Sequence, residues 1–509
     1  MLAGLLDFGI MSIAITYHEA TKYAPETIGN HPGLDWASQP LAHKEYHGDD
    51  AVSLAEYLPI DPNPFTGQAA KDIGEWQGRS LAALSRWIFF TYGVTAVVPQ
   101  PDRQLLLRAV PSAGGLYPAE LYVVIRDWPD IAPGLYGYDP RRHRLMLLAE
   151  GTATAEALTE ASYANAAIAK APVLAAITGV FERSRWRYQE RAYRRILLDT
   201  GHLIGNAGLV AHAVGLGMHA TAAFCDDRAD AALRLEQQEE GVLALIALDL
   251  QGPTARPSWT ALPSTTNETT NLPLLDALHR ASRLPPNRPR FLARGEVTTE
   301  ALETTHGWAA GDRLRGAGVA GPVPLAADLL GYVLRRRSCR RFGQVAFSRD
   351  TLARILAAAY VPEQVGLGEQ PTLDRARLAT FIAVINVTGV EPGVYYLAPH
   401  QLELRPVRLG NPRQATHFIA LGQDLCGDAG AVLFHTADLR GAVREMGDRA
   451  YRHLHLDAGI IGQRINLAAL AEGIGASGIG GFFDDHTADL LGIPREQAVV
   501  YITALGTPA

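Results

Sequence analysis

Apolar positions recur at helical spacing in two long segments of the chain. The apolar members of the first segment are Ile196, Leu203, Ile204, Ala207 and Val210. This spacing places them on one face of a helix, and Gly215 and Gly217 are residues of the kind that ends one. We therefore predict a helix of roughly two dozen residues, about 36 Å long at 1.5 Å per residue. A second such helix is predicted from about Arg449 to Glu472, ending at Gly473.

The two predicted helices lie in segments that repeat one another. Residues 191–227 and 449–485 align without a gap, 258 positions apart, and 15 of the 37 aligned positions are identical. A repeat of this length, spaced by about half of the chain, is typical of a duplicated and fused domain rather than of a solenoid of small units. Positions at which the copies differ should therefore carry information about function.

Continuous apolar runs predict the strands that accompany these helices. Residues 121–125 correspond to 381–385, and the runs 242–248 and 499–505 close the two copies. Runs without polar alternation are typical of strands that are covered on both faces. Each copy is thus predicted as strand, helix, strand, long helix and closing strand, which is an α+β domain.

The expected organisation has four parts. Residues 251–325 are rich in Pro, Thr and Asn, which indicates a linker extended over the surface. Its length lets the second copy dock on the first, as two subunits of a symmetric dimer would. The parts are an N-terminal extension (1–59), domain 1 (60–250), the linker (251–325) and domain 2 (326–509).

The composition describes a globular chain and excludes several classes of partner. Of the 509 residues, 48% are hydrophobic and 19% charged, and the formal net charge is −7. Because nucleic-acid binding needs a basic face, we expect no such partner. No apolar run approaches the roughly 18 to 20 residues that span a bilayer, so we expect no membrane segment. Cys225, Cys339 and Cys426 form no CxxC pair, which predicts neither a disulfide framework nor a metal site and favours a cytoplasmic location.

Three short segments have compositions that could hold a ligand. RRRSCRRF at 335–342 places five arginines around one serine, a set of donors suited to phosphate, although such a run is also typical of a solvated surface. AVPSAGGLYPAELYVV at 109–124 contains a glycine turn before a strand. This turn either admits a flat ligand close to the backbone or is an ordinary tight turn. ASGIGGFFDD at 476–485 is a glycine-rich connection of a common kind.

In this order, the three segments resemble the flavin-binding pattern of the nitroreductase family across residues 60–250 and 325–509. SAGGLYP, YRRILLDTGH and the N-terminal YHEATK and LDWASQP stretches are similar to the SagB/ThcOx-type dehydrogenases. The resemblance implies FMN as the cofactor and a tandem duplicated nitroreductase-like α+β fold that forms an intrachain pseudo-dimer in a monomeric chain. Those enzymes oxidise thiazolines and oxazolines in ribosomally made peptides to azoles.

The family builds its FMN site across a two-fold interface, and the resemblance implies a role for each matching residue. The implied phosphate ligands are Arg336, Ser338 and Arg340 of domain 2. The residues implied beside the flavin ring are Gly480 and Gly481, with Gln423 on its pyrimidine side. The floor beneath the ring would come from Ser112, Gly114 and Gly115 of domain 1.

The two copies are not equally equipped for this role. Where domain 2 has the arginine loop, domain 1 has residues 68–74, in which Lys71 is the only cation. Where domain 1 has the open glycine turn, domain 2 has Arg375, and Ala222 and Ala223 stand where domain 2 has its glycine pair. A two-fold pair has two equivalent composite sites, and every loss falls on the same one. We therefore predict one FMN per chain, between the two domains.

The candidate catalytic residues are Arg187 and Tyr188. In the azoline-oxidising relatives, a Lys-Tyr pair lies just before the long helix and is held to deprotonate the substrate. Arginine stays protonated and is a poor general base. Arg187 could instead bind a carboxylate or a developing oxyanion while Tyr188 acts as acid or base, or both residues could simply cap the helix.

The resemblance implies a two-electron dehydrogenation of a small molecule or a modified-peptide substrate, with a possible biosynthetic partner protein. One alternative is NAD(P)H-dependent reduction of nitro or quinone compounds. Another, of a different class, is a flavin-bearing scaffold without catalysis in a peptide-modification complex.

Overall fold

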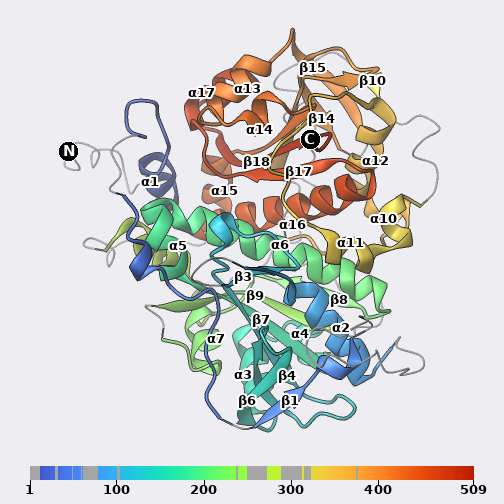
Figure 1. Cartoon of the computed structure of the whole chain (residues 1–509). Helices are drawn as coiled ribbons and strands as arrows, with labels where there is room; N and C mark the ends of the chain where they lie inside the picture. Colours follow the sequence, from blue (N-terminus) through green and yellow to red (C-terminus); the bar gives the residue numbers. More distant parts are fainter. Residues whose placement is uncertain are drawn as a thin grey trace.

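A computed structural model of the chain shows two lobes that meet along a pair of long helices (Figure 1). The residues it describes are 12–28, 33–48, 50–58, 60, 78–99, 104–236, 239–248, 272–287, 312–314, 322–373, 377–399 and 401–509. In these ranges, no helix is both long and apolar enough to cross a bilayer.

Each lobe contains one antiparallel seven-stranded sheet, and the two sheets have the same strand order. The first runs β1 (Ala51–Ser53), β6 (Arg144–Glu150), β5 (Gly134–Asp139), β4 (Ala119–Ile125), β7 (Val173–Val180), β9 (Glu240–Leu248) and β8 (Met218–Thr221). The second runs β10 (Asp312–Arg313), β15 (Glu403–Leu409), β14 (Gly393–Ala398), β12 (Leu378–Val384), β16 (Ala431–Ala437), β18 (Ala498–Gly506) and β17 (Gly475–Ile479). The predicted duplication is confirmed strand by strand.

The two long helices form where the sequence predicts them, as α6 (Ala192–Ala213) and α16 (Ala450–Ala471). Both end in the same way. Gly215 and Gly473 have φ of 73° and 71°, a left-handed conformation that glycine adopts without strain. The amides of the following residues return to the helix, as in the hydrogen bond of 2.9 Å from Leu216 N to Ala211 O. This is the Schellman arrangement.

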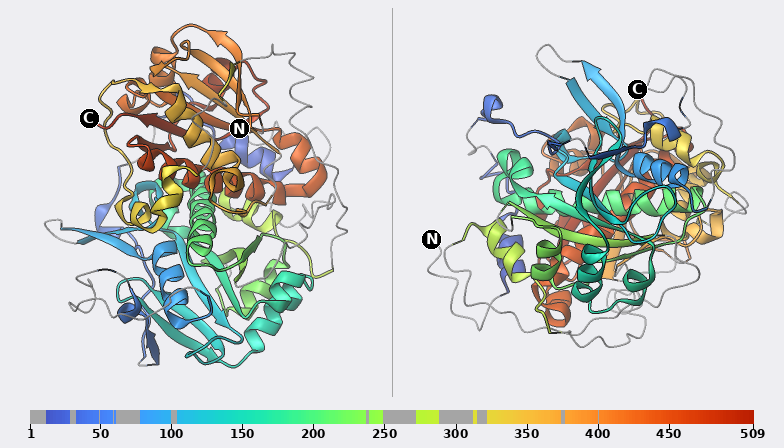
Figure 2. Two further views of the ribbon diagram at one scale, coloured as in Figure 1. Left: turned by 90° about the vertical axis from the view of Figure 1, so that its right-hand side faces the viewer. Right: turned by 90° about the horizontal axis from the view of Figure 1, so that it is seen from below.

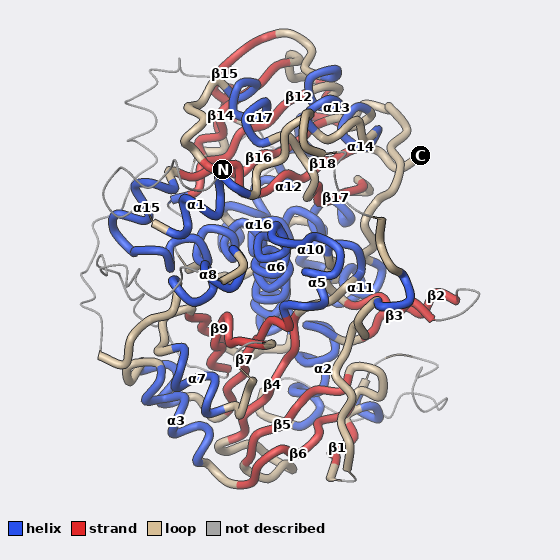
Figure 3. Tube along the Cα trace, turned by 90° about the vertical axis from the view of Figure 1, so that its left-hand side faces the viewer, coloured by secondary structure: helices blue, strands red, loops and turns tan. Residues whose placement is uncertain are grey.

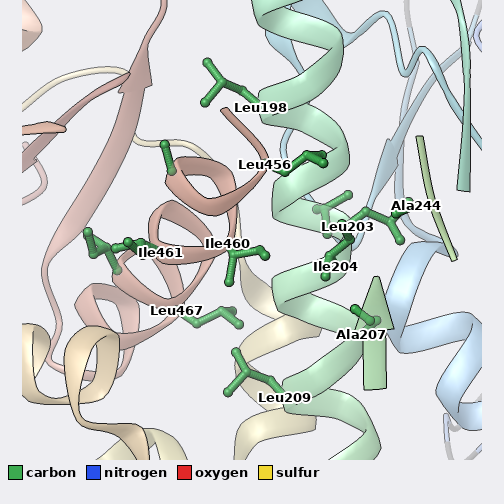
Figure 4. Close-up of a cluster of buried hydrophobic side chains, with 14 of the residues drawn as sticks. Leu198, Leu203, Ile204, Ala207, Leu209, Ala244, Leu456, Ile460, Ile461 and Leu467 are labelled. Carbon is green, nitrogen blue, oxygen red and sulfur yellow. The ribbon is translucent and has the colours of Figure 1, made fainter. Parts of the chain in front are cut away.

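The helices α6 and α16 cross at a pair of glycines, Gly201 and Gly459, which are equivalent in the repeat. A Cβ built on Gly201 would lie 2.9 Å from Cα of Gly459, and one built on Gly459 would lie 2.8 Å from Cα of Gly201. Side chains on both sides of the crossing, such as Leu198, Leu456 and Ile460, form one apolar cluster (Figure 4). The view in Figure 3 shows these helices between the two sheets.

A buried ion cluster ties the start of α6 to domain 2. Arg191 Nη1 and Arg194 Nη1 lie 2.9 Å and 2.7 Å from the two carboxylate oxygens of Asp484. The same arginines donate to the carbonyl of Thr21 and, at 2.7 Å, to that of His18. Both carbonyls belong to the C-terminal end of α1 (Ile13–Ala20). Domain 1, domain 2 and the N-terminal helix therefore meet at one carboxylate.

An equivalent cluster ties the start of α16 to domain 1. Arg449 Nη1 and Arg452 Nη1 lie 2.8 Å and 2.6 Å from Asp226 Oδ1. Arg452 also donates to Ser282 Oγ at 2.7 Å and to the His279 carbonyl at 2.9 Å, at the end of α8 (Leu274–Ala281). Burial acts against ionisation, but the two arginines hold the pKa of Asp226 below its usual value. Helix α8 is thus the counterpart of α1.

The duplicated unit is therefore longer than the sequence boundaries at residues 60 and 326 imply. The N-terminal extension supplies α1 and the edge strand β1, and the expected linker supplies α8 and the edge strand β10. Residues 274–281 are helical and packed against the body, not extended over the surface as expected. Short helices and two- or three-residue strands give little periodic signal, because their form is set by tertiary contacts.

The remaining elements cover the sheets and lead to the seam. In domain 1 they are α2 (Leu81–Tyr92), β2 (Val94–Pro99), β3 (Gln104–Arg108), α3 (Ala153–Ala161), α4 (Ala166–Lys170), α5 (Phe181–Tyr188) and α7 (Asp226–Ala232). In domain 2 they are α10 (Pro324–Ala327), α11 (Leu329–Arg335), β11 (Phe347–Ser348), α12 (Arg349–Tyr360), β13 (Val387–Thr388), α13 (Arg413–Ile419), α14 (Asp424–Gly427), α15 (Leu439–Met446) and α17 (Asp484–Leu491). The hairpin β2–β3 projects from the body (Figure 2).

Replacing Gly201 or Gly459 by Ala should destabilise the protein, because the added Cβ meets helix backbone that cannot move aside. We expect a loss of about 2 kcal/mol in the free energy of unfolding, measured by denaturant titration. Gly33→Ala is the matched control, since a Cβ there meets nothing within 4 Å. Equal unfolding midpoints for all three variants would contradict the close crossing.

Candidate functional site

The predicted arginine loop of domain 2 lies against domain 1 at the seam. Arg336 follows α11 and is 4% exposed. Its Nε donates to the Ala109 carbonyl at 2.9 Å, and its Nη2 donates to the Arg108 carbonyl at 3.2 Å. Its Nη1 is buried and has no hydrogen-bond partner in the described part of the protein. Burial lowers the pKa of this guanidinium to about 10, which still leaves it charged at neutral pH.

The glycine turn of domain 1 is held by a carboxylate of α6. Asp199 accepts hydrogen bonds from Ser112 Oγ at 2.5 Å and from Ala113 N at 3.2 Å. Ser112 Oγ in turn accepts from Tyr117 N at 2.8 Å. Gly114 and Gly115 follow with φ of 65° and 68°, so both need the freedom of glycine. The turn is therefore fixed at both ends and carries no side chain at Gly114 and Gly115.

The two candidate catalytic residues lie beside this turn. A Cβ built on Gly114 would lie 2.9 Å from the Tyr188 hydroxyl and 3.1 Å from Cδ of Arg187. Gln189 follows them with φ of 47° and ψ of −131°, a conformation that costs a side-chain-bearing residue about 1–3 kcal/mol. The equivalent residue of domain 2 is Gly447, with φ of 61°. The strained junction between α5 and α6 thus sets the position of Tyr188.

The glycine connection of domain 2 lies close to the same residues. Arg195 of α6 donates to the Gly480 carbonyl, and a Cβ on Gly480 would lie 2.5 Å from Cζ of Arg195. The Arg195 guanidinium also lies 5.3 Å from the centre of the Tyr188 ring. Gln423 Nε2 is 3.5 Å from the Gly481 carbonyl. The glycine connection, Arg195 and Tyr188 therefore form one continuous surface across the seam.

The structure brings together most of the predicted site residues. Within the described residues, the side chains of Ser338 and Arg340 make no hydrogen bond or ion pair, and Arg340 is exposed. They adjoin the buried Arg336 in the chain, so their donors are available to a ligand at this edge of the seam. No group of three or more His, Cys, Asp or Glu side chains in these ranges could hold a metal ion.

The site is strongly cationic, with one carboxyl group beneath it. Burial raises the pKa of Asp199 to about 7, against the lowering effect of Ser112, Ala113 and Arg195. Burial also raises the pKa of Tyr188, although Arg195 and Arg187 act in the opposite direction. The phenol therefore keeps its proton at neutral pH and can donate it.

Most of the equivalent residues on the other side of the two-fold axis are more deeply buried, and they differ in chemistry. Ala222 and Ala223 are 1% and 3% exposed, whereas Gly480 and Gly481 are partly exposed. The residue equivalent to Tyr188 is Met446, which is 2% exposed. The residue equivalent to Arg187 is Glu445, which pairs with Arg377. Lys71 and Arg375, on which the predicted asymmetry also rests, lie outside the described residues.

Arg195 and Asp199 are site residues that the sequence analysis did not single out. Both lie in the YRRILLDTGH segment, but a charged residue within a long helix has no distinctive spacing. The repeat did contain a signal for Asp199, because the equivalent residue of the second copy is also an aspartate, Asp457. The structure explains this identity: Asp457 accepts a hydrogen bond from Leu373 N at 2.8 Å, so the carboxylate binds the equivalent turn in both copies.

Comparison with known proteins agrees with this architecture. The sequence pattern described as "Nitroreductase family" matches residues 91–248 and 333–507, which together are more than half of the chain. The chain belongs to the nitroreductase family. The predicted membership and the predicted duplicated fold are both confirmed, and the protein is an oxidoreductase of this superfamily.

The most informative similarity to other nitroreductase-family proteins extends over both domains. A solved structure from Anabaena variabilis, titled as a nitroreductase, has a TM-score of 0.83 and 38% identity, and covers 98% of this chain and 100% of its own. The nitroreductase MJ1384 of Methanocaldococcus jannaschii is 33% identical over 31% of this chain and 76% of its own length. The trifolitoxin-processing protein TfxB of Rhizobium leguminosarum is 35% identical over 40% of this chain, and the match spans 57% of TfxB.

The raised pKa of Asp199 predicts a pH dependence of stability. Between pH 3.8 and about 7, the folded protein binds more protons at this carboxyl than the unfolded chain, so the free energy of unfolding falls as pH rises. Asp199→Asn removes this titration. The advantage of the wild type over the variant should therefore shrink by on the order of 2 kcal/mol between pH 5 and pH 7.5, measured by denaturant titration. A constant difference across this range would contradict the assignment.

Proposed function

We propose that the protein is an FMN-dependent dehydrogenase that oxidises a small molecule or a peptide-derived heterocycle at the seam between its domains. The observation that carries this proposal is the meeting of Tyr188 and Arg187 with the bare turn at Gly114, next to Gly480 of the other domain. A glycine turn lets the backbone come close to a flat ligand, and fixed donors beside it can orient a redox cofactor.

The residues present fit FMN. Among the residues that the structure describes, the buried Arg336 has one guanidinium nitrogen without a partner, and the side chains of Ser338 and Arg340 make no hydrogen bond or ion pair. This set of donors matches a phosphate dianion. The Cβ positions of Gly114 and Gly480 lie against Tyr188 and the Arg195 guanidinium, whereas the nearest atom to a Cβ on Gly115 would be Leu105 Cδ1 at 3.7 Å, so the turn leaves space at Gly115. We assign Arg336, Ser338 and Arg340 to the phosphate, Ser112, Gly114 and Gly115 to the floor, and Gly480, Gly481 and Gln423 to the edge of the ring.

FMN supplies two-electron chemistry when bound, and the chain supplies binding and proton handling. Tyr188 holds a proton at its hydroxyl, close to the turn. Because a dehydrogenation removes a proton as well as a hydride from the substrate, Tyr188 would pass its own proton to solvent before it takes up that of the substrate. Arg187 remains charged and orients an anionic or strongly polar group beside that hydroxyl. Asp199 holds the turn in place through Ser112 and Ala113. Because Gln189 lies at the junction of α5 and α6, the orientation of Tyr188 is set by this helix junction and not by a flexible loop.

We place one FMN in each chain. The two-fold equivalents of the glycine pair and of Tyr188 are the buried residues Ala222, Ala223 and Met446, so the second composite position lacks both the space and the phenol. This pattern agrees with the asymmetry expected from Lys71 and Arg375.

We extend the substrate class to modified peptides because two relatives carry such functions in their names. TfxB is a trifolitoxin-processing protein, and McbC of Escherichia coli, 28% identical over 27% of this chain, is a microcin B17-processing protein. The match spans 57% of TfxB and 52% of McbC. A partner protein of a peptide-modification pathway belongs to the same proposal.

A reductase is the second candidate, and the charge state of the site favours it. Tyr188 stays protonated and lies beside two guanidinium groups, an arrangement that stabilises a developing oxyanion on a nitro or quinone substrate. Arginine in place of a basic lysine also removes the usual base for dehydrogenation.

Anaerobic mixing distinguishes the two activities. We expect the purified protein to be yellow and its visible flavin absorbance to bleach when a thiazoline-containing peptide is added. NADPH should bleach it slowly or not at all. Rapid bleaching by NADPH, with no bleaching by the thiazoline peptide, would contradict the dehydrogenase proposal and support the reductase. No bleaching with either reagent would favour a scaffold without catalysis.

The phosphate assignment is tested by two neighbouring exposed arginines. Arg340→Ala should weaken FMN binding by about 10- to 100-fold, since a charged hydrogen bond contributes roughly 1.5–3 kcal/mol. Arg341→Ala is the matched control, because Arg341 is equally exposed and lies outside the assigned set. Fluorescence titration with FMN gives both affinities. Equal losses in the two variants would show only general attraction by positive charge.

A further inference from the structure

Helix α5 carries three arginines, and one of them lacks an acidic partner. Arg183 lies 2.6 Å from a carboxylate oxygen of Glu120, and Arg185 pairs with Asp276. In the described part of the chain, Arg187 makes no ion pair and no hydrogen bond, and it is exposed. Its guanidinium lies 5.8 Å from the centre of the Tyr188 ring. The unpaired arginine is thus the one at the candidate site.

A second guanidinium lies beside the same tyrosine ring. Arg195 is 3% exposed, and its centre lies 5.3 Å from the ring centre of Tyr188. Its hydrogen bond goes to the Gly480 carbonyl, and no carboxylate of the described residues lies within ion-pair distance of it. Buried arginines are normally paired with anions. The arginines at the start of α6 follow that rule at Asp484, but Arg195 does not.

The local charges therefore do not balance. Under the proposed function, the phosphate of FMN is matched by Arg336 and Arg340. Asp199 accepts hydrogen bonds from Ser112 and Ala113 and also interacts electrostatically with Arg195. One carboxyl group faces two guanidinium groups, Arg187 and Arg195, so at least one positive charge beside the phenol is unmatched.

We propose that Arg187 and Arg195 form a carboxylate-binding subsite beside Tyr188, and that the substrate carries a carboxylate next to the bond that reacts. This inference rests on the proposed function and narrows its substrate class. Arginine suits this task because its planar fork binds both oxygens of a carboxylate. Arg187 and Tyr188 both lie at the turn, since a Cβ built on Gly114 would lie 3.1 Å from Cδ of Arg187 and 2.9 Å from the Tyr188 hydroxyl. A group anchored by the Arg187 guanidinium would therefore adjoin that hydroxyl.

The subsite is tested with benzoate and its uncharged analogue benzamide as probes, on the FMN-loaded full chain. Isothermal titration calorimetry should show benzoate binding at least about tenfold more tightly than benzamide, as expected for a charged pair. Arg187→Gln should remove this preference, and Arg187→Lys should retain part of it. Arg195→Lys should reduce it, since the ammonium lacks the fork. Arg185→Gln is the matched control on the same helix and should leave the preference unchanged.

Three results would overturn the subsite: no binding of benzoate to the wild type, equal affinities for benzoate and benzamide, or equal effects of Arg187→Gln and Arg185→Gln. The flavin spectrum of each sample is recorded in parallel. A colourless wild-type protein that cannot be loaded with FMN would count against the proposed function instead. A yellow protein without the benzoate preference would count against the carboxylate subsite alone.

Discussion

The architecture depends on two buried arginine–aspartate clusters, in each of which arginines of one domain bind an aspartate of the other. Each long helix begins with a pair of arginines that binds an aspartate of the other domain, Asp484 in one case and Asp226 in the other. Removing one member of a buried ion pair leaves an uncompensated charge and costs roughly 3–5 kcal/mol. The two domains are therefore locked in one relative position, and the glycine crossing of α6 and α16 allows that position to be close.

The two ion clusters are equivalent by the two-fold repeat, but the segments that they hold in place differ. Asp484 lies three residues after Gly481 in the glycine connection that reaches Arg195, so the first cluster fixes the side of the seam that carries the candidate site. Asp226 follows Ala222 and Ala223, which are buried, so the second cluster fixes a packed side. Under the proposed function, one copy of this symmetric scaffold holds the anionic end of the cofactor while the other supplies the glycine turn and the proton donor.

The sequence predicted the repeated elements well and the peripheral ones poorly. The helices α6 and α16 and the strands β4, β9, β12 and β18 have long apolar patterns, and their positions were predicted closely. The short elements α1, α8, β1 and β10 were missed because their order comes from contacts with the arginine clusters and with sheet edges. The site was predicted from the resemblance and from the glycines. Arg195 and Asp199 were missed because they are distant in sequence from the segments they bind, and only the fold brings Asp199 to Ser112 and Arg195 to Gly480.

The number of FMN molecules in each chain tests the central claim most directly. Flavin released from a known amount of saturated protein can be measured by absorbance, and a crystal structure of the same sample gives its position. The account predicts one FMN per chain, at the seam between Arg336 and the turn at Gly114. Two FMN molecules per chain in equivalent positions, or one on the side of Ala222 and Met446, would contradict it.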